Sequence, residues 1–288
     1  MTRIRSELNA PQFADPLQPM NQAVPASGGA AHHRNPSHPA ADTTCSPPAG
    51  ADDSLAKPAA GAIPRYLQQT YWWAYVHPRA VRFFERQWLV NLILWGNFDR
   101  LRNAALDALG SRIDGRTLQI ACVYGNFTAT LAGRLAPGAS LDVVDVLPIQ
   151  LQNLRAKLPA AAPVALHLCD SSTLGFADGT YDQAVLFFLL HEQPADVRTG
   201  TLREALRVLK PGGKLVIVDY HLPARWHPLR YLFEPVLRIL EPYAIDLWRH
   251  EIAKWLPEGF PAEQIRKRNY YGGLYQELVI TVAPRACS

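Results

Sequence analysis

The sequence predicts a doubly wound α/β fold built on a mostly parallel sheet, and three observations support this. Short, continuously apolar runs are typical of strands that are buried on both faces. Helical patterns alternate with these runs over residues 118–220. A Pro-Gly-Gly turn that begins at Pro211 leads into the last run of the series. In such a fold, ligands bind at the carboxyl ends of the strands.

The first 62 of the 288 residues are predicted to be a disordered tail, because they are rich in Ala, Pro, Ser, Gly and His and contain almost no aliphatic runs. A targeting sequence is the alternative. A secretory signal is disfavoured, since no apolar segment follows the charged start. A mitochondrial presequence stays open, because two early arginines favour it and two early acidic residues count against it. The catalytic domain is expected at 63–288.

Residues 63–112 are expected to form aromatic N-terminal helices that Pro78 divides. The second of them, 79–109, repeats apolar residues at three- and four-residue steps and is followed by Gly110, a typical C-cap residue.

The remaining elements follow in order. Strands are expected at 118–123, 141–146, 164–168, 181–190 and 212–220, and helices at 126–135, 148–158 and 195–209. A helical insertion, 221–260, is predicted to be kinked or broken at Pro228, Pro235 and Pro242. A last strand within 274–284 is expected at the edge of the sheet.

Charge and cysteine content limit the function classes. The net charge of +4 and the pI near 8.9 are compatible with a basic face that meets nucleic acid or an anionic membrane, and equally with a merely solvated face. The four cysteines lie far apart without a CxxC pair, which disfavours a zinc site and fits a reducing compartment. The longest apolar run, 88–95, is too short to span a bilayer.

The loops after the strands carry a pattern of their own. The first strand leads to a Gly-containing turn, the second ends in Asp145, and the third is followed by Asp170. "LGFADGTYD" (174–182) and "LRVLKPGGKLVIVD" (206–219) come next. Over 117–220 this order resembles the class I S-adenosylmethionine-dependent methyltransferases. The resemblance implies a Rossmann-like sheet with an antiparallel last strand and S-adenosylmethionine as the cofactor.

The same resemblance implies roles for the acids. Asp145 would accept hydrogen bonds from the ribose hydroxyls, with Val146 beside it at the cofactor, and Asp170 with Ser171 would meet the adenine amino group. Asp145 is also a candidate for capping the helix that opens at Pro148, and both interpretations stay open.

The first loop departs from that family, in which an acid-x-Gly-x-Gly-x-Gly sequence lets the backbone approach the methionine moiety. Gln119 stands in the place of the acid, Ala121 and Val123 stand in place of the first two glycines, and Gly125 remains, followed by Asn126. Because both acids after the strands are present, we expect a rebuilt site, in which S-adenosylmethionine lies differently, rather than a decayed one.

Three segments carry a closer resemblance: "YWWAYVHPRAVRFFERQWLVNLILWGNF" (71–98), "ACVYGNFT" (121–128) and "FFLLHEQP" (187–194). They resemble the RquA family of rhodoquinone-biosynthesis enzymes over nearly the whole folded part. The resemblance implies that ubiquinone is converted to rhodoquinone, with an amino group from S-adenosylmethionine replacing a ring methoxy group in the presence of manganese. Presenting the α-amine instead of the methyl group requires the methionine end to be re-aimed, and the altered loop is where that would be done.

Candidate catalytic residues are His191, Glu192 and Tyr124. His191 would serve as an acid–base group for the amine or for the departing methanol; the alternative is that His191 and Glu192 are a polar pair at a helix start. Candidate metal ligands are Asp145, Asp170 and His191, with Glu192 and Tyr124 as further donors. None of them has a diagnostic spacing, and Asn126 stands where the family has an acid, so the ligand set stays open.

Aromatic residues near the start of the folded part suit a flat quinone ring and its isoprenoid tail. The substrate candidates are Tyr71, Trp72, Tyr75 and His77, with Trp73 beside them. Ordinary packing of an N-terminal helix on the sheet is the alternative.

The expected partner is ubiquinone, reached by peripheral contact with the inner membrane from the cytoplasm through 225–254 and the first helices. A nucleic-acid substrate is not expected, because the Asn/Asp-Pro-Pro-Tyr type of motif after the fourth strand is absent. An ordinary methyltransferase of a quinone or another small molecule, and a non-catalytic binding protein, remain alternatives. Oligomeric state and tail length are left open.

Overall fold

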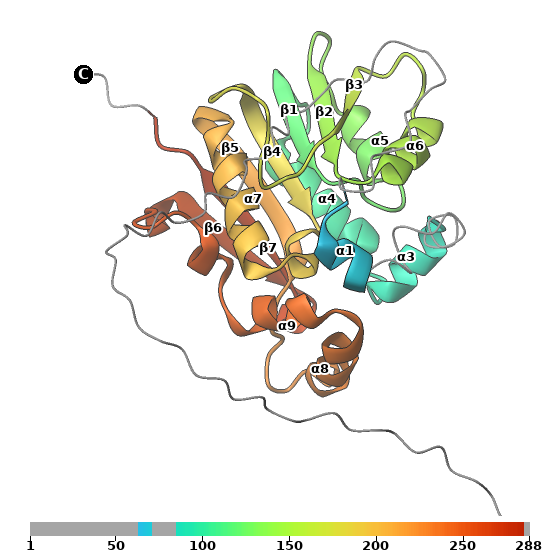
Figure 1. Ribbon diagram of the computed structural model, residues 1–288, viewed down its shortest axis with the longest axis vertical. Coiled ribbons are helices and arrows are strands. Elements are labelled where there is room, and N and C mark those ends of the chain that lie inside the picture. The colour runs from blue at the N-terminus through green and yellow to red at the C-terminus, as the bar shows by residue number, and fades with distance from the viewer. Residues whose placement is uncertain (1–62, 71–84, 285–288) are drawn as a thin grey trace, which may run out of the picture. The chain divides into compact units, whose positions relative to one another are not determined.

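The computed structural model describes residues 63–70 and 85–284 (Figure 1). They contain a seven-stranded sheet of order β3-β2-β1-β4-β5-β7-β6. The strands are β1 Arg116–Ile120, β2 Ser140–Asp145, β3 Val164–Leu168, β4 Tyr181–Phe187, β5 Leu209–Tyr220, β6 Ile265–Tyr270 and β7 Tyr275–Thr281. The pairs among β1 to β5 are parallel, and β7 is antiparallel to both of its neighbours. The prediction of a doubly wound, Rossmann-like sheet with an antiparallel last strand is confirmed.

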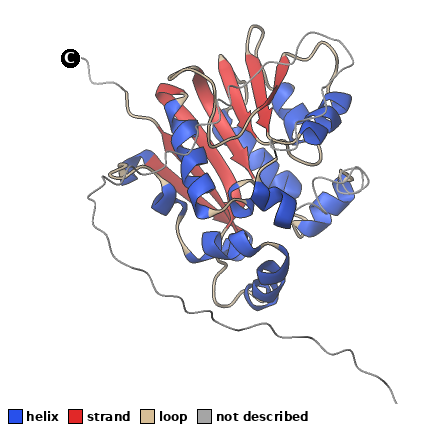
Figure 2. Ribbon diagram, in the orientation of Figure 1, coloured by secondary structure: helices blue, strands red, loops and turns tan. Residues whose placement is uncertain are grey.

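Helices lie on both faces of this sheet (Figure 2). The α-helices are α1 Arg65–Thr70, α3 Gln87–Ile93, α4 Phe98–Leu109, α5 Phe127–Ala132, α6 Pro148–Lys157, α7 Ala195–Arg207, α8 Leu229–Leu240 and α9 Pro242–Arg249. Short 3-10 segments are η2 Leu190–Glu192, η3 Ile252–Trp255, η4 Ala262–Gln264 and η5 Tyr271–Gly273. None of the described helices is long and apolar enough to cross a lipid bilayer.

The alternation of side chains along β4 shows how both faces are covered. Val185 and Phe187 belong to a core that includes α4 and α5 residues, whereas Ala184 and Leu186 belong to a second core that includes α7 residues. Because successive side chains of a strand point to opposite faces, a continuously apolar strand supplies both cores.

The predicted helix 79–109 is wrong as a single element. Of its described part, α3 ends at Ile93 and α4 begins at Phe98, and between them Trp95 and Gly96 have φ angles of 52° and 75°. Left-handed backbone cannot continue a right-handed helix, so the chain turns here.

Two predicted strands are shorter than expected for the same reason. Ala121 (φ 73°) ends β1 at Ile120, and Phe188 (φ 56°) ends β4 at Phe187. Non-glycine residues in this conformation cost free energy and concentrate at functional sites. Both residues line the cavity described below.

The end of the chain also differs from the expectation. β7 does not form the sheet edge, because β6 pairs with its outer side. Pro228 and Pro242 lie at helix starts, where proline is tolerated, but Pro235 lies inside α8.

Candidate active site

A cavity of about 410 Å³ lies at the carboxyl ends of β1, β2, β4 and β5. Its walls differ in polarity. One side is formed by the loop after β1 and the end of β2, with polar groups of Tyr124, Asp145 and Gln150. The other side is mainly apolar and comes from α3, α8, the start of α4 and the end of β4. The apolar lining includes Val90, Ile93, Leu94, Phe98, Phe187, Phe188, Phe233, Val236 and Leu237. The cavity therefore suits a ligand set with one polar and one hydrophobic part.

In the loop after β1, residues other than glycine occupy two positions at which the family has glycine. Ala121 takes the left-handed conformation that glycine would allow, and its carbonyl accepts a hydrogen bond from Gln119 Nε2 at 2.9 Å. Val123 and Tyr124 line the cavity. The Tyr124 hydroxyl accepts a hydrogen bond from Gln150 Nε2 at 2.9 Å, and burial raises the pKa of Tyr124. Tyr124 therefore stays protonated near neutral pH.

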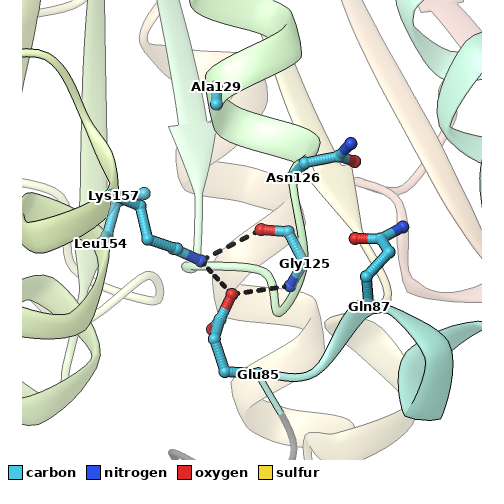
Figure 3. A pocket seen from close by; sticks show the side chains of 7 residues that line it. All are labelled: Glu85, Gln87, Gly125, Asn126, Ala129, Leu154 and Lys157. Carbon is cyan, nitrogen blue, oxygen red and sulfur yellow. Dashed lines mark hydrogen bonds and ion pairs between the residues drawn. The ribbon is translucent and has the colours of Figure 1, made fainter.

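The backbone of Gly125, the one family glycine that remains in the loop, is bound by Glu85 and Lys157 (Figure 3). Glu85 accepts hydrogen bonds from the Gly125 N–H (3.1 Å) and from Lys157 Nζ (2.7 Å), and the same ammonium donates to the Gly125 carbonyl (3.0 Å). Asn126, at the N-terminus of α5, accepts a hydrogen bond from Arg102 at 2.7 Å. Glu85, Gly125, Asn126 and Lys157 line a smaller hollow of about 290 Å³. The backbone N–H and carbonyl of Gly125 are thus already engaged.

Asp145 connects the loop after β1 to the residue that precedes α6. One carboxylate oxygen accepts the N–H of Leu147 at 2.8 Å, just before α6, and the other accepts the N–H of Cys122 at 2.8 Å. Asp145 and Val146 both line the cavity. Burial outweighs these hydrogen bonds and raises the pKa of Asp145 to about 6. The carboxylate thus fixes the β1 loop to the start of α6 and has lone pairs left for a ligand.

Asp170 and Ser171 are not among the cavity-lining residues. Asp170 accepts hydrogen bonds from the N–H and hydroxyl of Ser172, and the Ser171 hydroxyl pairs with Thr201 at 2.8 Å. Tyr66 of α1 does line the cavity, and burial together with the charges of Asp170, Glu192 and Asp145 raises the pKa of Tyr66. A tyrosine therefore lies among the acids expected to hold the nucleoside.

His191 is buried at the cavity and is surrounded by three carboxylates. Its Nδ1 lies 2.9 Å from Oδ1 of Asp219, at the end of β5. Its Nε2 lies 3.7 Å from Glu192 and 3.6 Å from Glu241. Burial opposes the charge on His191, but Asp219, Glu241 and Glu192 outweigh it and raise its pKa to about 9. His191 is therefore an imidazolium at neutral pH, suited to donate a proton.

Comparisons with known proteins agree with this geometry. Residues 117–213 match the family model of a methyltransferase domain. The chain is 30% identical over 202 residues to a demethylmenaquinone methyltransferase of Beutenbergia cavernae, covering 66% of this chain and 80% of that protein. It is 28% identical over 221 residues to the ubiquinone/menaquinone biosynthesis C-methyltransferase UbiE of Cereibacter sphaeroides, covering 72% and 87%. The chain belongs to the class I S-adenosylmethionine-dependent methyltransferases.

A solved structure shares the methyltransferase fold at lower identity. Phosphoethanolamine N-methyltransferase 2 of Haemonchus contortus, in complex with S-adenosyl-L-methionine, has a TM-score of 0.51 and 16% identity, covering 76% of this chain and 59% of that one. This likeness concerns the fold alone.

One buried charged residue beside the His191 segment was not predicted from the sequence. Arg198 of α7 is fully buried, and its guanidinium donates to the carbonyls of Leu190 (2.9 Å), Gln193 (2.9 Å) and Tyr243 (3.1 Å). It also pairs with Asp246 at 3.1 Å. Arg198 thus ties η2, which carries His191, to α9, which directly follows Glu241.

The predicted metal ligands do not form a site in the part of the chain that the structure describes. Within residues 63–70 and 85–284, no group of three or more His, Cys, Asp or Glu side chains is arranged to hold a metal ion. Asp145 and Asp170 each engage backbone N–H groups, and His191 is paired with Asp219. The substrate candidates Tyr71, Trp72, Tyr75 and His77, and the predicted tail 1–62, lie outside the described ranges.

Proposed function

We propose that this enzyme uses S-adenosylmethionine to modify the ring of a prenylated quinone of the ubiquinone type, replacing a methoxy group by an amino group. The observation that carries the proposal is the acid–base group around His191, which lies at a cavity with a largely apolar wall. Two relatives that are named as quinone-biosynthesis methyltransferases support a quinone as the substrate class. A long apolar tail suits the wall formed by α3 and α8.

The exchange needs one proton donor and one proton acceptor. The ring carbon gains a bond to nitrogen and loses its bond to the methoxy oxygen, which leaves as methanol after protonation. His191, held as an imidazolium, supplies that proton. Glu241, whose pKa burial raises, is suited to take the proton that the attacking amine gives up. An ionised acceptor beside a cationic donor keeps the net charge of the site unchanged during the exchange.

The nitrogen must also leave the carbon skeleton that brought it. Oxidation of the donor's α-carbon would release an electron pair, the α-proton and the remaining proton of the nitrogen; the quinone ring would take up the pair and both protons and become a hydroquinone. Water then adds to that carbon as the C–N bond breaks, and the skeleton leaves as a 2-oxo acid. No external oxidant is required, because the quinone itself is reduced by two electrons.

The altered loop after β1 supports a different placement of the methionine end of S-adenosylmethionine. Ala121 and Val123 line the cavity at positions where the family has glycine, and Glu85 occupies the N–H of Gly125. The manganese implied by the resemblance to RquA has no matching donor set among the residues that the structure describes, so no step is assigned to it.

Carbon methylation of a quinone precursor is a second candidate, favoured by the names of the relatives. It requires a base for a ring hydroxyl, and Glu192 or Glu241 would have to act as that base, because an imidazolium cannot.

The deciding experiment incubates purified protein with a short-tailed ubiquinone and S-adenosylmethionine labelled with a nitrogen isotope at the α-amine, with and without manganese. Mass spectrometry should find a lighter quinone that carries the label, together with an unlabelled 2-oxo acid. A heavier, unlabelled product would assign the chain to methylation. Substitution His191→Asn provides the inactive control.

A further inference from the structure

The exposed large apolar side chains of the described residues are concentrated in two places. Ten such residues are exposed, and nine of them lie within 88–95 and 226–239. They are Trp88, Leu92, Ile93, Trp95, Trp226, Tyr231, Leu232, Val236 and Ile239. Leu168, at the end of β3, is the tenth. Scattered apolar residues need no explanation, but a contiguous group of this kind marks an interaction site.

α8 is apolar on two sides. Leu229 and Leu237 are buried and contribute to the core. The adjoining side carries Leu232, Val236 and Ile239, which are 54%, 42% and 80% exposed. Steps of four and three residues place these three on one helical face. Packing explains the first side of the helix, whereas the second side is left exposed by the residues that the structure describes.

α3 extends this surface. Trp88, Leu92 and Trp95 follow one another at steps of four and three residues and are 58%, 64% and 42% exposed. The ring of Trp95, in the turn that follows α3, lies 5.8 Å from that of Phe233, so this turn contacts α8. We call the nine residues named above the α3–α8 surface.

The α3–α8 surface borders the mouth of the active-site cavity. Ile93 and Val236 each line the cavity and are each 42% exposed. An apolar tail that passes between α3 and α8 would therefore reach the cavity without crossing a polar rim.

The charge of the segment that contains α8 indicates which kind of apolar partner this surface binds. Residues 225–240 contain three arginines, Arg225, Arg230 and Arg238, and one acidic residue, Glu234, which gives a net charge of +2. Arg225 and Arg238 are exposed. Tryptophan, tyrosine and arginine beside an exposed aliphatic stripe are the composition of segments that lie in a membrane interface.

We propose that the α3–α8 surface docks on an anionic lipid bilayer and admits the isoprenoid tail of the substrate between α3 and α8. The tail entry rests on the proposed function, whereas docking itself does not. The helices would lie in the interface, with Leu232 and Ile239 among the lipid tails and Arg225 and Arg238 at the phosphates.

The test is co-sedimentation of the full-length protein with vesicles of phosphatidylcholine containing phosphatidylglycerol, at low and high salt. Wild type should bind the anionic vesicles, and less so in high salt. Ile239→Glu should weaken binding by about tenfold or more, because one aliphatic side chain no longer leaves water. Leu168→Glu, the matched change at the exposed apolar residue away from this surface, should bind as wild type does.

Three outcomes would overturn docking: wild type that stays in the supernatant, equal losses for Ile239→Glu and Leu168→Glu, or a loss of self-association instead of vesicle binding. Vesicle binding without any quinone product would leave docking intact and reject the proposed function. If docking and the proposed function are both correct, Ile239→Glu should impair turnover of a long-tailed quinone in vesicles. Turnover of a short-tailed quinone in solution should be unchanged.

Discussion

Nδ1 of His191 lies 2.9 Å from Oδ1 of Asp219, and both side chains are buried. Asp219 also accepts the backbone N–H groups of Leu190 and His191, so the aspartate fixes both the ring and the segment that carries it. Against the opposing effect of burial, the carboxylates around the ring raise the pKa of His191 from its ordinary value of 6.5 to about 9. The contribution of this charge to stability is therefore fully present below about pH 6.5 and is lost as the pH rises through about 9.

If His191 is the proton donor, kcat/KM falls as the pH rises through about 9. Asp219→Asn should move that fall toward neutral pH. Glu241→Gln should move it less, because Glu241 lies 3.6 Å from the ring and makes no hydrogen bond to it, but it should also lower kcat/KM at every pH, because the proposed proton acceptor is lost. The measurement is the pH dependence of kcat/KM for the three proteins, with thermal unfolding to verify folding. An alkaline limb that neither substitution moves would remove His191 from the chemistry.

If Asp145 holds the ribose hydroxyls, its protonation limits cofactor affinity at low pH. The ionised carboxylate is the stronger acceptor for two hydroxyls, and its pKa is raised to about 6. Below that pH, the affinity for S-adenosylhomocysteine should fall by about tenfold per pH unit. Asp145→Asn should bind weakly at every pH. Titration calorimetry measures both, and an affinity that is flat through pH 6 would contradict a role for this carboxylate at the cofactor.

Two opposite substitutions in the loop should have opposite effects. Ala121→Gly relieves a left-handed alanine (φ 73°) and should raise the free energy of unfolding by up to about 1 kcal/mol. Gly125→Ala places a Cβ atom 2.7 Å from Oε1 of Gln87 and 3.1 Å from the Phe98 ring, at a φ of 80°, and should lower it by about 1 to 3 kcal/mol. Denaturant unfolding of both proteins gives the comparison; equal effects would mean that the loop is not held as described.

The sheet was predictable from sequence because each central strand is buried on both faces and is therefore continuously apolar. β6 was not predicted, since its residues alternate between half-buried and exposed and it pairs on one side only. Asp145 was found by its position after a strand. Asp219 and Glu241 were missed, because their relation to His191 depends on segments that meet only in the folded chain, 28 residues apart in the case of Asp219.

The loop after β1 was partly predictable. The sequence showed that glycines were replaced, which led to the expectation of a rebuilt site. It did not show that Ala121 adopts the glycine conformation or that Glu85 binds the Gly125 N–H, because a residue 40 positions earlier supplies that contact.

Arg198 gives the last prediction, since its charge is fully buried and is satisfied by three carbonyls and Asp246. Arg198→Met should lower the free energy of unfolding by about 3 to 5 kcal/mol, because these acceptors lose their donor. Arg203→Met, at an exposed position of the same helix, should change it by less than about 0.5 kcal/mol.

A purely structural role for Arg198 would lower stability alone. A positioning role predicts more: at a temperature where Arg198→Met is folded, the alkaline limb of kcat/KM should also shift toward neutral pH, because η2 and the Glu241 segment are no longer held together around His191. Arg198→Lys restores the positive charge but not the planar set of N–H donors. The alkaline limb of kcat/KM for this variant should therefore lie between those of wild type and Arg198→Met. An unshifted limb in the folded Arg198→Met protein would confine this arginine to stability.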